Sequence, residues 1–309
     1  MTPQIALAGA VDGAVLRAAG WDVRGALHLT PYDDPAEVVS YADLDDLLAD
    51  GALSAVALDG AEPATAVHLP ALLGRGLHVL LPGPAPLDGD LLRRARQAQG
   101  AAEVAVGLLQ RWEPWARTVA AALPLVGTPV LQATVRGWPR GVSAAAELVD
   151  LARAWCGDVL SVVAAPGPLP AAALGPGLPV AWALLHAGGA TTLVCHEGSP
   201  PLARLSFATA RLEAGPLGAR WEGGAELPLL SGTVAGRAAA DVPWAPAPPA
   251  GTPAGLLGSA AALAEAALTG EVDVTRWPWP ADLGDLQAAA AVLEALRESA
   301  RRSAPVRVG

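Results

Sequence analysis

The first third of the chain alternates short continuous apolar runs with amphipathic segments. Runs such as Ile5–Ala8, Val56–Leu58 and Leu77–Leu81 are too short for helices and lack polar alternation, which is typical of parallel strands buried on both faces. Between the last two runs, apolar residues recur at helical spacing from Ala64 to Leu73, and two glycines follow. The pattern predicts a β-α-β unit inside a doubly wound parallel sheet.

After residue 112 the pattern changes to a few helices and a series of short strand candidates. This order is typical of an α+β domain with an open, mostly antiparallel sheet. We expect Leu256–Leu268 and Leu286–Arg302 to be Ala-rich helices that pack back on the first domain. Strands are predicted over 128–137, 159–164, 180–185, 191–196, 203–209 and 217–221.

The predicted second sheet has helices on one side only, which bears on assembly. We expect its other face to carry large apolar residues such as Trp182, Leu184 and Phe207. A sheet with an exposed apolar face usually finds a partner. The sequence therefore predicts a homodimer that forms through the C-terminal sheet.

The turn after the first strand stands where a dinucleotide fingerprint, G-x-G-x-x-G/A, would lie between a strand and a helix. Gly9 and Ala14 fit its first and third positions, and Val11 occupies the second. We expect the branched side chain of Val11 to block close approach of a pyrophosphate, and Asp12 to add an unfavourable negative charge. The positional candidates for cofactor binding in this turn are Gly9, Ala10, Val11, Asp12 and Gly13.

Gly76, His78 and Val79 lead into the strand 77–81 in a way that resembles the "A-G-K-H-V" segment of the Gfo/Idh/MocA oxidoreductases. The resemblance implies an N-terminal Rossmann-type domain over residues 1–112, a substrate and dimerisation domain over 113–309, an NAD or NADP cofactor, and a sugar, polyol or related substrate. In that family the strand runs into Glu-Lys-Pro, whose lysine lies beside the nicotinamide. Here the corresponding residues are Pro82, Gly83 and Pro84. Further positional cofactor candidates are Thr30, Gly83 and Pro84, with Thr30 at the end of the second strand, where an acidic residue is expected to bind the ribose.

The family also carries His-x-x-Asp on a helix of its second domain, and this pair falls on Glu147 and Asp150. At a spacing of three residues both carboxylates lie on one helix face. Two close carboxylates raise the pKa of one of them and provide a general base. The alternative is that they are ordinary solvated or capping charges on an Ala-rich helix.

Composition excludes several classes of partner. A net charge of −10 argues against nucleic acid, and no apolar run approaches membrane-spanning length. Cys156 and Cys195 lie far apart without metal-ligand spacing, which suits a reducing cytoplasm. His186 and His196 lie on predicted strands, but their neighbour Glu197 points to the opposite face, so no metal site is expected.

Two functions remain open from the sequence. The first is a Gfo/Idh/MocA-like oxidoreductase homologue, NAD(P)-dependent by resemblance and degenerate in catalysis, with Asp150 and Glu147 as candidate proton-transfer residues. The second is a non-catalytic ligand-binding or scaffold protein that retains the oxidoreductase fold. Val11, Gly83 and Glu147 depart from the family at the phosphate, lysine and histidine positions.

Overall fold

The chain forms two compact units in a computed structural model. One unit holds Met1–Leu109 and Trp244–Gln287, and the other holds Gln110–Pro243 and Ala288–Gly309. The predicted boundary after residue 112 stays a prediction, because residues 109, 110 and 112 lie outside the described part. The structure describes residues 2–27, 38–83, 89–108, 111, 113–136, 142–165, 181–195, 202–215, 218–223, 254–270 and 281–309.

Sheet A of the first unit is parallel and, within the described residues, has six strands in the order β3-β2-β1-β4-β5-β6. Strands β1, β4 and β5 are almost entirely buried, because their continuous apolar sequences face helices on both sides. The doubly wound sheet predicted from these runs is confirmed. The strands are β1 (Gln4–Ala8), β2 (Asp22–Leu27), β3 (Val39–Tyr41), β4 (Ala55–Leu58), β5 (His78–Leu81) and β6 (Val104–Val106).

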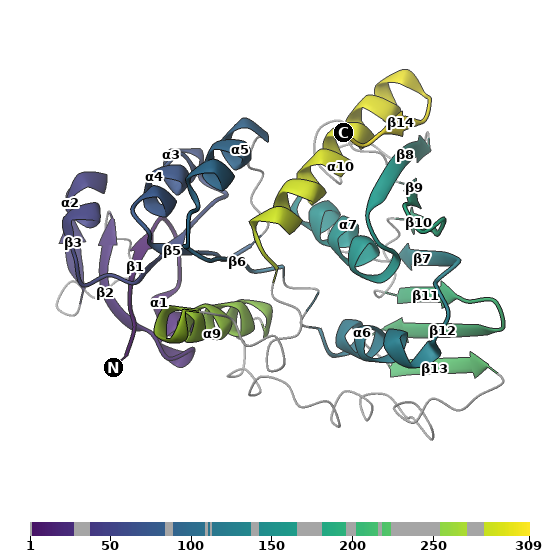
Figure 1. The fold of residues 1–309 in the computed structure, drawn as a ribbon, viewed down its shortest axis with the longest axis horizontal. Coiled ribbons are helices and arrows are strands. Elements are labelled where there is room, and N and C mark those ends of the chain that lie inside the picture. Colours follow the sequence, from purple (N-terminus) through teal and green to yellow (C-terminus); the bar gives the residue numbers. More distant parts are fainter. Residues whose placement is uncertain are drawn as a thin grey trace. The chain divides into compact units, whose positions relative to one another are not determined.

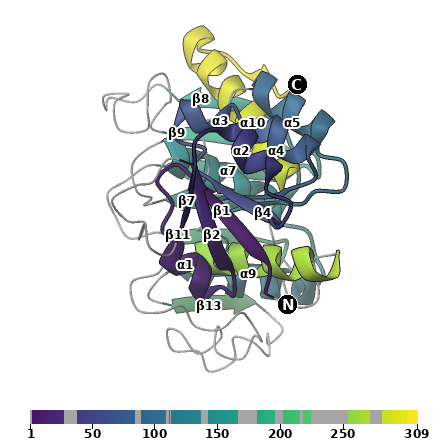
Figure 2. The same cartoon turned by 90° about the vertical axis from the view of Figure 1, so that its left-hand side faces the viewer.

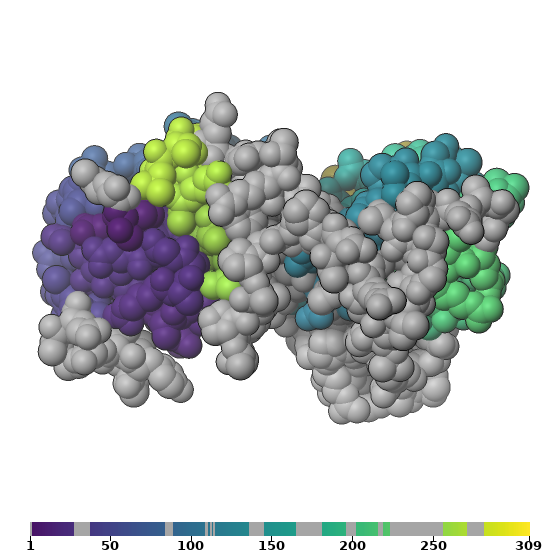
Figure 3. Space-filling model, turned by 90° about the horizontal axis from the view of Figure 1, so that it is seen from below, coloured from purple at the N-terminus to yellow at the C-terminus, as the bar shows by residue number. Residues whose placement is uncertain are grey.

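Helices cover both faces of sheet A (Figures 1 and 2). On one face lie α3 (Pro63–Ala66), α4 (Leu69–Gly74) and α5 (Gly89–Ala98), with α2 (Leu44–Ala49) near β3. On the other, α9 (Ala254–Thr269) packs beside α1 (Gly13–Ala18), and their surfaces adjoin in Figure 3.

Helix α9 is attached to this sheet by its side chains. Leu256, Ala260 and Leu263 belong to the same core cluster as Leu7 on β1. The indole Nε1 of Trp21 donates to Ala260 O at 2.8 Å. Helix α9 therefore packs on sheet A, whereas residues 288–302 belong to the other unit. The packing of both C-terminal helices on a first domain that ends at residue 112 stays a prediction.

The helix predicted over 64–73 is two helices, α3 and α4, with a break at Val67 and His68. Pro70 causes the break, because proline has no N–H and its ring clashes with the carbonyl four residues earlier. Pro70 instead lies in the first turn of α4, where proline is favoured. The single-helix prediction was wrong because it counted apolar spacing and passed over the proline.

Sheet B of the second unit has eight strands among the described residues, in the order β13-β12-β11-β7-β10-β9-β8-β14. Only the β7–β10 pair is parallel in this part of the chain, which confirms the predicted mostly antiparallel sheet. Helices α6 (Pro114–Val126) and α7 (Val142–Cys156) pack on one face. The strands are β7 (Gln132–Arg136), β8 (Val159–Ala165), β9 (Ala181–His186), β10 (Thr191–Cys195), β11 (Leu202–Ser206), β12 (Ala210–Gly215), β13 (Gly218–Gly223) and β14 (Val306–Arg307), and most of α10 (Leu283–Arg302) also belongs here.

The residues expected on the open face of sheet B lie inside. Trp182 and Leu184 are fully buried and Phe207 is 5% exposed. Side chains alternate along a strand, so the neighbours of Trp182 and Leu184 must face outward. The open face instead carries an apolar patch on β8, β9 and β10, made of Leu160, Val163, Leu185 and Leu193.

None of the helices in the described ranges combines the length and the apolar character that crossing a bilayer requires.

Candidate functional site

The candidate cofactor site lies where β1 and β4 end side by side. In the order β2-β1-β4, the strand order of sheet A reverses between β1 and β4. Ligands of open α/β sheets bind at the carboxyl ends of the strands at this topological switch point. Gly9 follows β1 with φ of +90°, and a Cβ on it would lie 2.6 Å from Cβ of Asp59, which follows β4. Position 9 therefore requires glycine.

Val11 does not stand in the way of a ligand. Its side chain is 3% exposed and belongs to the same core cluster as Leu7 and Leu263. Its φ is outside the positive range, so the branched side chain causes no strain there. The prediction that Val11 blocks a pyrophosphate was wrong, because the turn directs this side chain into the core.

Asp12 occupies the helix end that a phosphate would use. It is the N-cap of α1, and its Oδ1 accepts from Ala14 N at 2.8 Å. The free N–H groups and partial positive charge of a helix N-terminus are what bind a phosphate. A carboxylate already uses one of these groups here. A cation is close as well, since Arg17 Nη1 lies 3.6 Å from where a Cβ of Gly13 would be.

Gly83 follows β5 by two residues, and among the described residues no atom beyond its chain neighbours lies within 4 Å of where its Cβ would be. Ala10 and Gly13 lie in the described turn between β1 and α1, and Gly13 opens α1. Thr30 and Pro84 lie outside the described residues.

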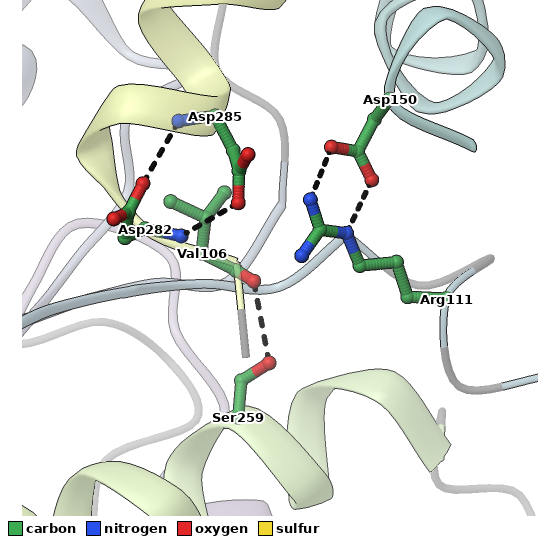
Figure 4. Close-up of polar contacts among 6 residues, drawn as sticks. All are labelled: Val106, Arg111, Asp150, Ser259, Asp282 and Asp285. Atoms are coloured by element: carbon green, nitrogen blue, oxygen red, sulfur yellow. Dashed lines mark hydrogen bonds and ion pairs between the residues drawn. The ribbon is translucent and has the colours of Figure 1, made fainter. Parts of the chain in front are cut away.

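Asp150 on α7 forms a buried ion pair with Arg111. Its Oδ2 accepts from Arg111 Nε and its Oδ1 accepts from Arg111 Nη2, both at 2.5 Å (Figure 4). The two side chains are 1% and 5% exposed. Both carboxylate oxygens are thus held by one guanidinium, the geometry that arginine and carboxylates favour.

Glu147 lies three residues before Asp150 on α7 and is 6% exposed. The alternative that this pair consists of solvated surface charges was therefore wrong. A buried carboxylate beside a bound ion pair is either a functional group or part of the buried polar structure of α7. Their predicted roles in proton transfer stay predictions.

The residues at the end of β1 do not fit a dinucleotide in the manner of the fingerprint. Fitting it would require an available helix N-terminus, and Asp12 caps it. Asp59 and Glu62 add further acidic groups beside Gly9. Metal binding finds no support in the described ranges either, where no three His, Cys, Asp or Glu side chains are arranged to hold an ion.

No pattern in the sequence indicated a partner for Arg111. Arg111 and Asp150 are 39 residues apart, and only Asp150 lies on one of the α-helices named above, so no spacing rule connects them. The available signal was indirect: two acidic residues at helical spacing on a mostly apolar helix require a cation if they are buried.

No protein-family profile matches the chain. No curated protein matches it either. Solved structures do match over the full length, at low sequence identity.

The WlbA dehydrogenase from Bordetella pertussis, solved with NADH and UDP-GlcNAcA, has a TM-score of 0.73 at 17% identity and covers 100% of this chain and 98% of its own. Levoglucosan dehydrogenase, solved with NADH and levoglucosan, has a TM-score of 0.74 at 14% sequence identity, and the match covers 100% of both chains. A myo-inositol dehydrogenase from Corynebacterium glutamicum has a TM-score of 0.70 at 15% sequence identity, and the match covers 100% of this chain and 99% of that one. These neighbours are dehydrogenases of the Gfo/Idh/MocA type, and the predicted resemblance is confirmed at the level of the fold.

Proposed function

We propose that this protein is a Gfo/Idh/MocA-like oxidoreductase homologue, derived from NAD(P)-dependent dehydrogenases of sugars, polyols or related substrates, whose catalysis is degenerate. The observation that carries the first half is the likeness over the whole length of both chains to dehydrogenases solved with NADH. Sheet A and the second α+β unit are both covered by this likeness, which supports descent from a whole dehydrogenase rather than from one of its domains.

The proposed degeneration of cofactor binding and catalysis rests on three positions. Asp12 takes an N–H that a pyrophosphate would use. Gly83 has no side chain to replace the family's lysine. Asp150 is held by Arg111 through both oxygens, and the adjacent guanidinium favours the charged carboxylate over the protonated form. The loss of a positioned acid or base typically lowers the rate by about 10² to 10⁴.

A second candidate is a non-catalytic scaffold or ligand-binding protein in the cytoplasm, and the capped N-terminus of α1 favours it. Asp12 stabilises the helix without any ligand, as N-cap carboxylates do. Such a protein would keep the fold for its surfaces and bind no nicotinamide nucleotide.

Calorimetric titration with NAD⁺, NADH, NADP⁺ and NADPH separates these functions. We expect weak binding, with dissociation constants of about 1 mM or higher, and no hydride transfer with sugars or polyols. Absence of any heat of binding at several millimolar nucleotide would favour the scaffold. Micromolar affinity for any of the four, together with turnover, would overturn the degenerate half and return Asp150 and Glu147 to catalytic roles.

We also propose a homodimer through the open face of sheet B. The apolar patch defined above lies beside a charged region where Arg204 pairs with Glu213. Leu193→Arg should disrupt a dimer by placing a charge in the patch, whereas Val39→Arg, on an exposed residue of β3, is the matched control. Light scattering should give a dimer mass for wild type and V39R and a monomer for L193R. A monomeric wild type at micromolar concentration would contradict the proposal.

A further inference from the structure

A hollow of about 470 Å³ lies between the last turns of α10 and strand β14 in the second unit, both yellow in Figure 1. Ala291 and Ala295 form part of its lining, and their short side chains leave space that a longer side chain would fill. Pockets that bind small organic molecules have volumes of about 300–1,000 Å³. This α10 hollow therefore has room for a small molecule.

Both walls of the α10 hollow are attached to strand β8. On the helix side, the buried hydroxyl of Ser299 accepts from Ala164 N at 3.0 Å and donates to Ala304 O at 2.6 Å. On the strand side, Val308 N donates to Leu160 O at 3.0 Å. The backbone on either side of the hollow is thus held in place by the sheet, which makes the hollow a preformed feature of the fold.

Arginines outnumber glutamates around the α10 hollow. The charged residues that line it are Arg297, Arg301, Arg307, Glu294 and Glu298. Glu298 is already bound by Arg301 and by the adjacent Arg302. Within the part of the chain that the structure describes, the side chains of Arg297 and Arg307 form no ion pair. Two cationic groups are therefore available to a ligand, on a protein whose net charge is −10.

We propose that the α10 hollow binds a small phosphate monoester that carries hydroxyl groups. Arginine binds phosphate and carboxylate oxygens through its planar set of N–H donors. Arg297 and Arg307 belong to different elements, and a phosphate monoester offers three strong acceptor oxygens that two guanidinium groups can share. A carboxylate has only two oxygens, which one arginine can occupy.

Glu294 accounts for the hydroxyl groups of the ligand. Its carboxylate lines the hollow and forms no ion pair among the described residues. An ionised carboxylate only accepts hydrogen bonds, so it suits the hydroxyl groups of a phosphate ester and disfavours a second anionic group. The remaining space, beyond that of one phosphate group, fits the carbon skeleton that carries these hydroxyls.

Calorimetric titration of the full chain with inorganic phosphate, glycerol 3-phosphate and glycerol tests the site, at constant ionic strength because salt screens exposed charges. We expect both phosphates to bind and glycerol not to bind. Glycerol 3-phosphate should bind about two- to tenfold more tightly than inorganic phosphate, because its hydroxyls add hydrogen bonds. No binding of either phosphate at about 10 mM would overturn the proposal. Equal affinity for the two phosphates would indicate an adventitious ion only, and would overturn it as well.

Arg297→Gln and Arg307→Gln each remove one charge from the hollow and should weaken binding of glycerol 3-phosphate about tenfold. Arg211→Gln is the matched control, since Arg211 is an exposed arginine on β12, six strands from β14 in sheet B. This variant should bind as wild type does. All three should unfold at the wild-type temperature without ligand, as surface variants do. Wild-type affinity in both R297Q and R307Q, or an equal loss in R211Q, would overturn the proposal.

Glu294→Ala separates the two parts of the ligand. The variant should still bind inorganic phosphate but should lose the preference for glycerol 3-phosphate, and an unchanged preference would overturn the hydroxyl contact. The α10 hollow shares no residue with the turn after β1, so Asp12→Gly should leave the affinity for glycerol 3-phosphate unchanged. The outcome is therefore independent of whether the protein binds a nicotinamide nucleotide.

Discussion

Arg111 binds both carboxylate oxygens of Asp150 at 2.5 Å, and neither side chain is more than 5% exposed. Removing one partner leaves a buried charge without its counter-ion, which typically costs about 3–5 kcal/mol. We therefore expect Asp150→Ala to lower the free energy of unfolding by about that amount. Chemical denaturation measures it.

The exposed pair Arg93–Asp90 on α5 is the matched control, since its side chains are 61% and 77% exposed. Asp90→Ala should change the free energy of unfolding by no more than about 1 kcal/mol. Replacing both buried partners, as in Arg111→Met with Asp150→Leu, should recover much of the loss. Equal effects of D150A and D90A would show that the buried pair has no special role in the fold.

Removing the carboxylate of Asp12 should improve nucleotide binding. Two like charges about 4 Å apart in water repel by about 1 kcal/mol, or about fivefold in affinity. Asp12→Gly costs α1 only a few tenths of a kcal/mol, because glycine is tolerated at N-caps. Calorimetry with NADH should thus detect tighter binding by D12G.

Asp43 makes the same kind of cap on α2, where its Oδ1 accepts from Asp46 N at 2.9 Å. Asp43→Gly should leave the affinity for NADH unchanged. If D12G and D43G bind alike, Asp12 is not what weakens the site.

Two glycines near the carboxyl end of β5 should differ in how much stability the protein loses when each is replaced by alanine. A Cβ on Gly107 would lie 2.6 Å from Pro82 O, a backbone atom that cannot move aside, whereas a Cβ on Gly83 meets no described atom beyond its chain neighbours within 4 Å. Gly107→Ala should lower the free energy of unfolding by about 1–3 kcal/mol, as overpacking does. Gly83→Ala, and also Gly83→Lys, should stay within about 0.5 kcal/mol of wild type, as surface changes do. Thermal denaturation of the three variants decides this, and a G83K variant as unstable as G107A would contradict it.

Cys156 should react slowly with alkylating reagents. Burial raises the pKa of its thiol to about 11, so about 0.1% is thiolate at pH 8, against about a quarter for a free thiol. The higher intrinsic nucleophilicity of such a thiolate offsets part of this, leaving alkylation about 20-fold slower.

Iodoacetamide labelling of native and urea-unfolded protein, followed by peptide mass spectrometry, compares the two rates for Cys156. Thr192→Val removes the hydroxyl beside the sulfur and should leave the thiol slow, since burial is the larger cause. Native labelling as fast as unfolded labelling would contradict a raised pKa of the Cys156 thiol.

The sequence predicted the strands of sheet A well, because strands buried on both faces leave continuous apolar runs. It failed where one residue overrides a pattern, as Pro70 does in the predicted helix 64–73. It also omitted two strands of sheet B, β12 and β14. β12 was missed because its Arg211 and Glu213 interrupt the apolar pattern of a strand that has one face open.

At the candidate site the sequence predicted which residue types are present, but not the directions in which their side chains point. Val11 was assigned to the phosphate side from its position in the turn, and only the backbone course shows that it enters the core. The partner of Asp150 comes from a segment far away in the chain. Such a pairing depends on the tertiary fold and leaves no periodic signal.

The contribution of α9 to the core of the first unit has a consequence for biosynthesis. A ribosome completes β6 about 150 residues before α9 appears, which at about 5–20 residues per second is a delay of roughly 8–30 s. Throughout that interval Leu7, Leu16 and Trp21 lack the apolar partners that α9 supplies. The nascent N-terminal half is thus a natural client for chaperones, and its core is completed only after α9 has been synthesised.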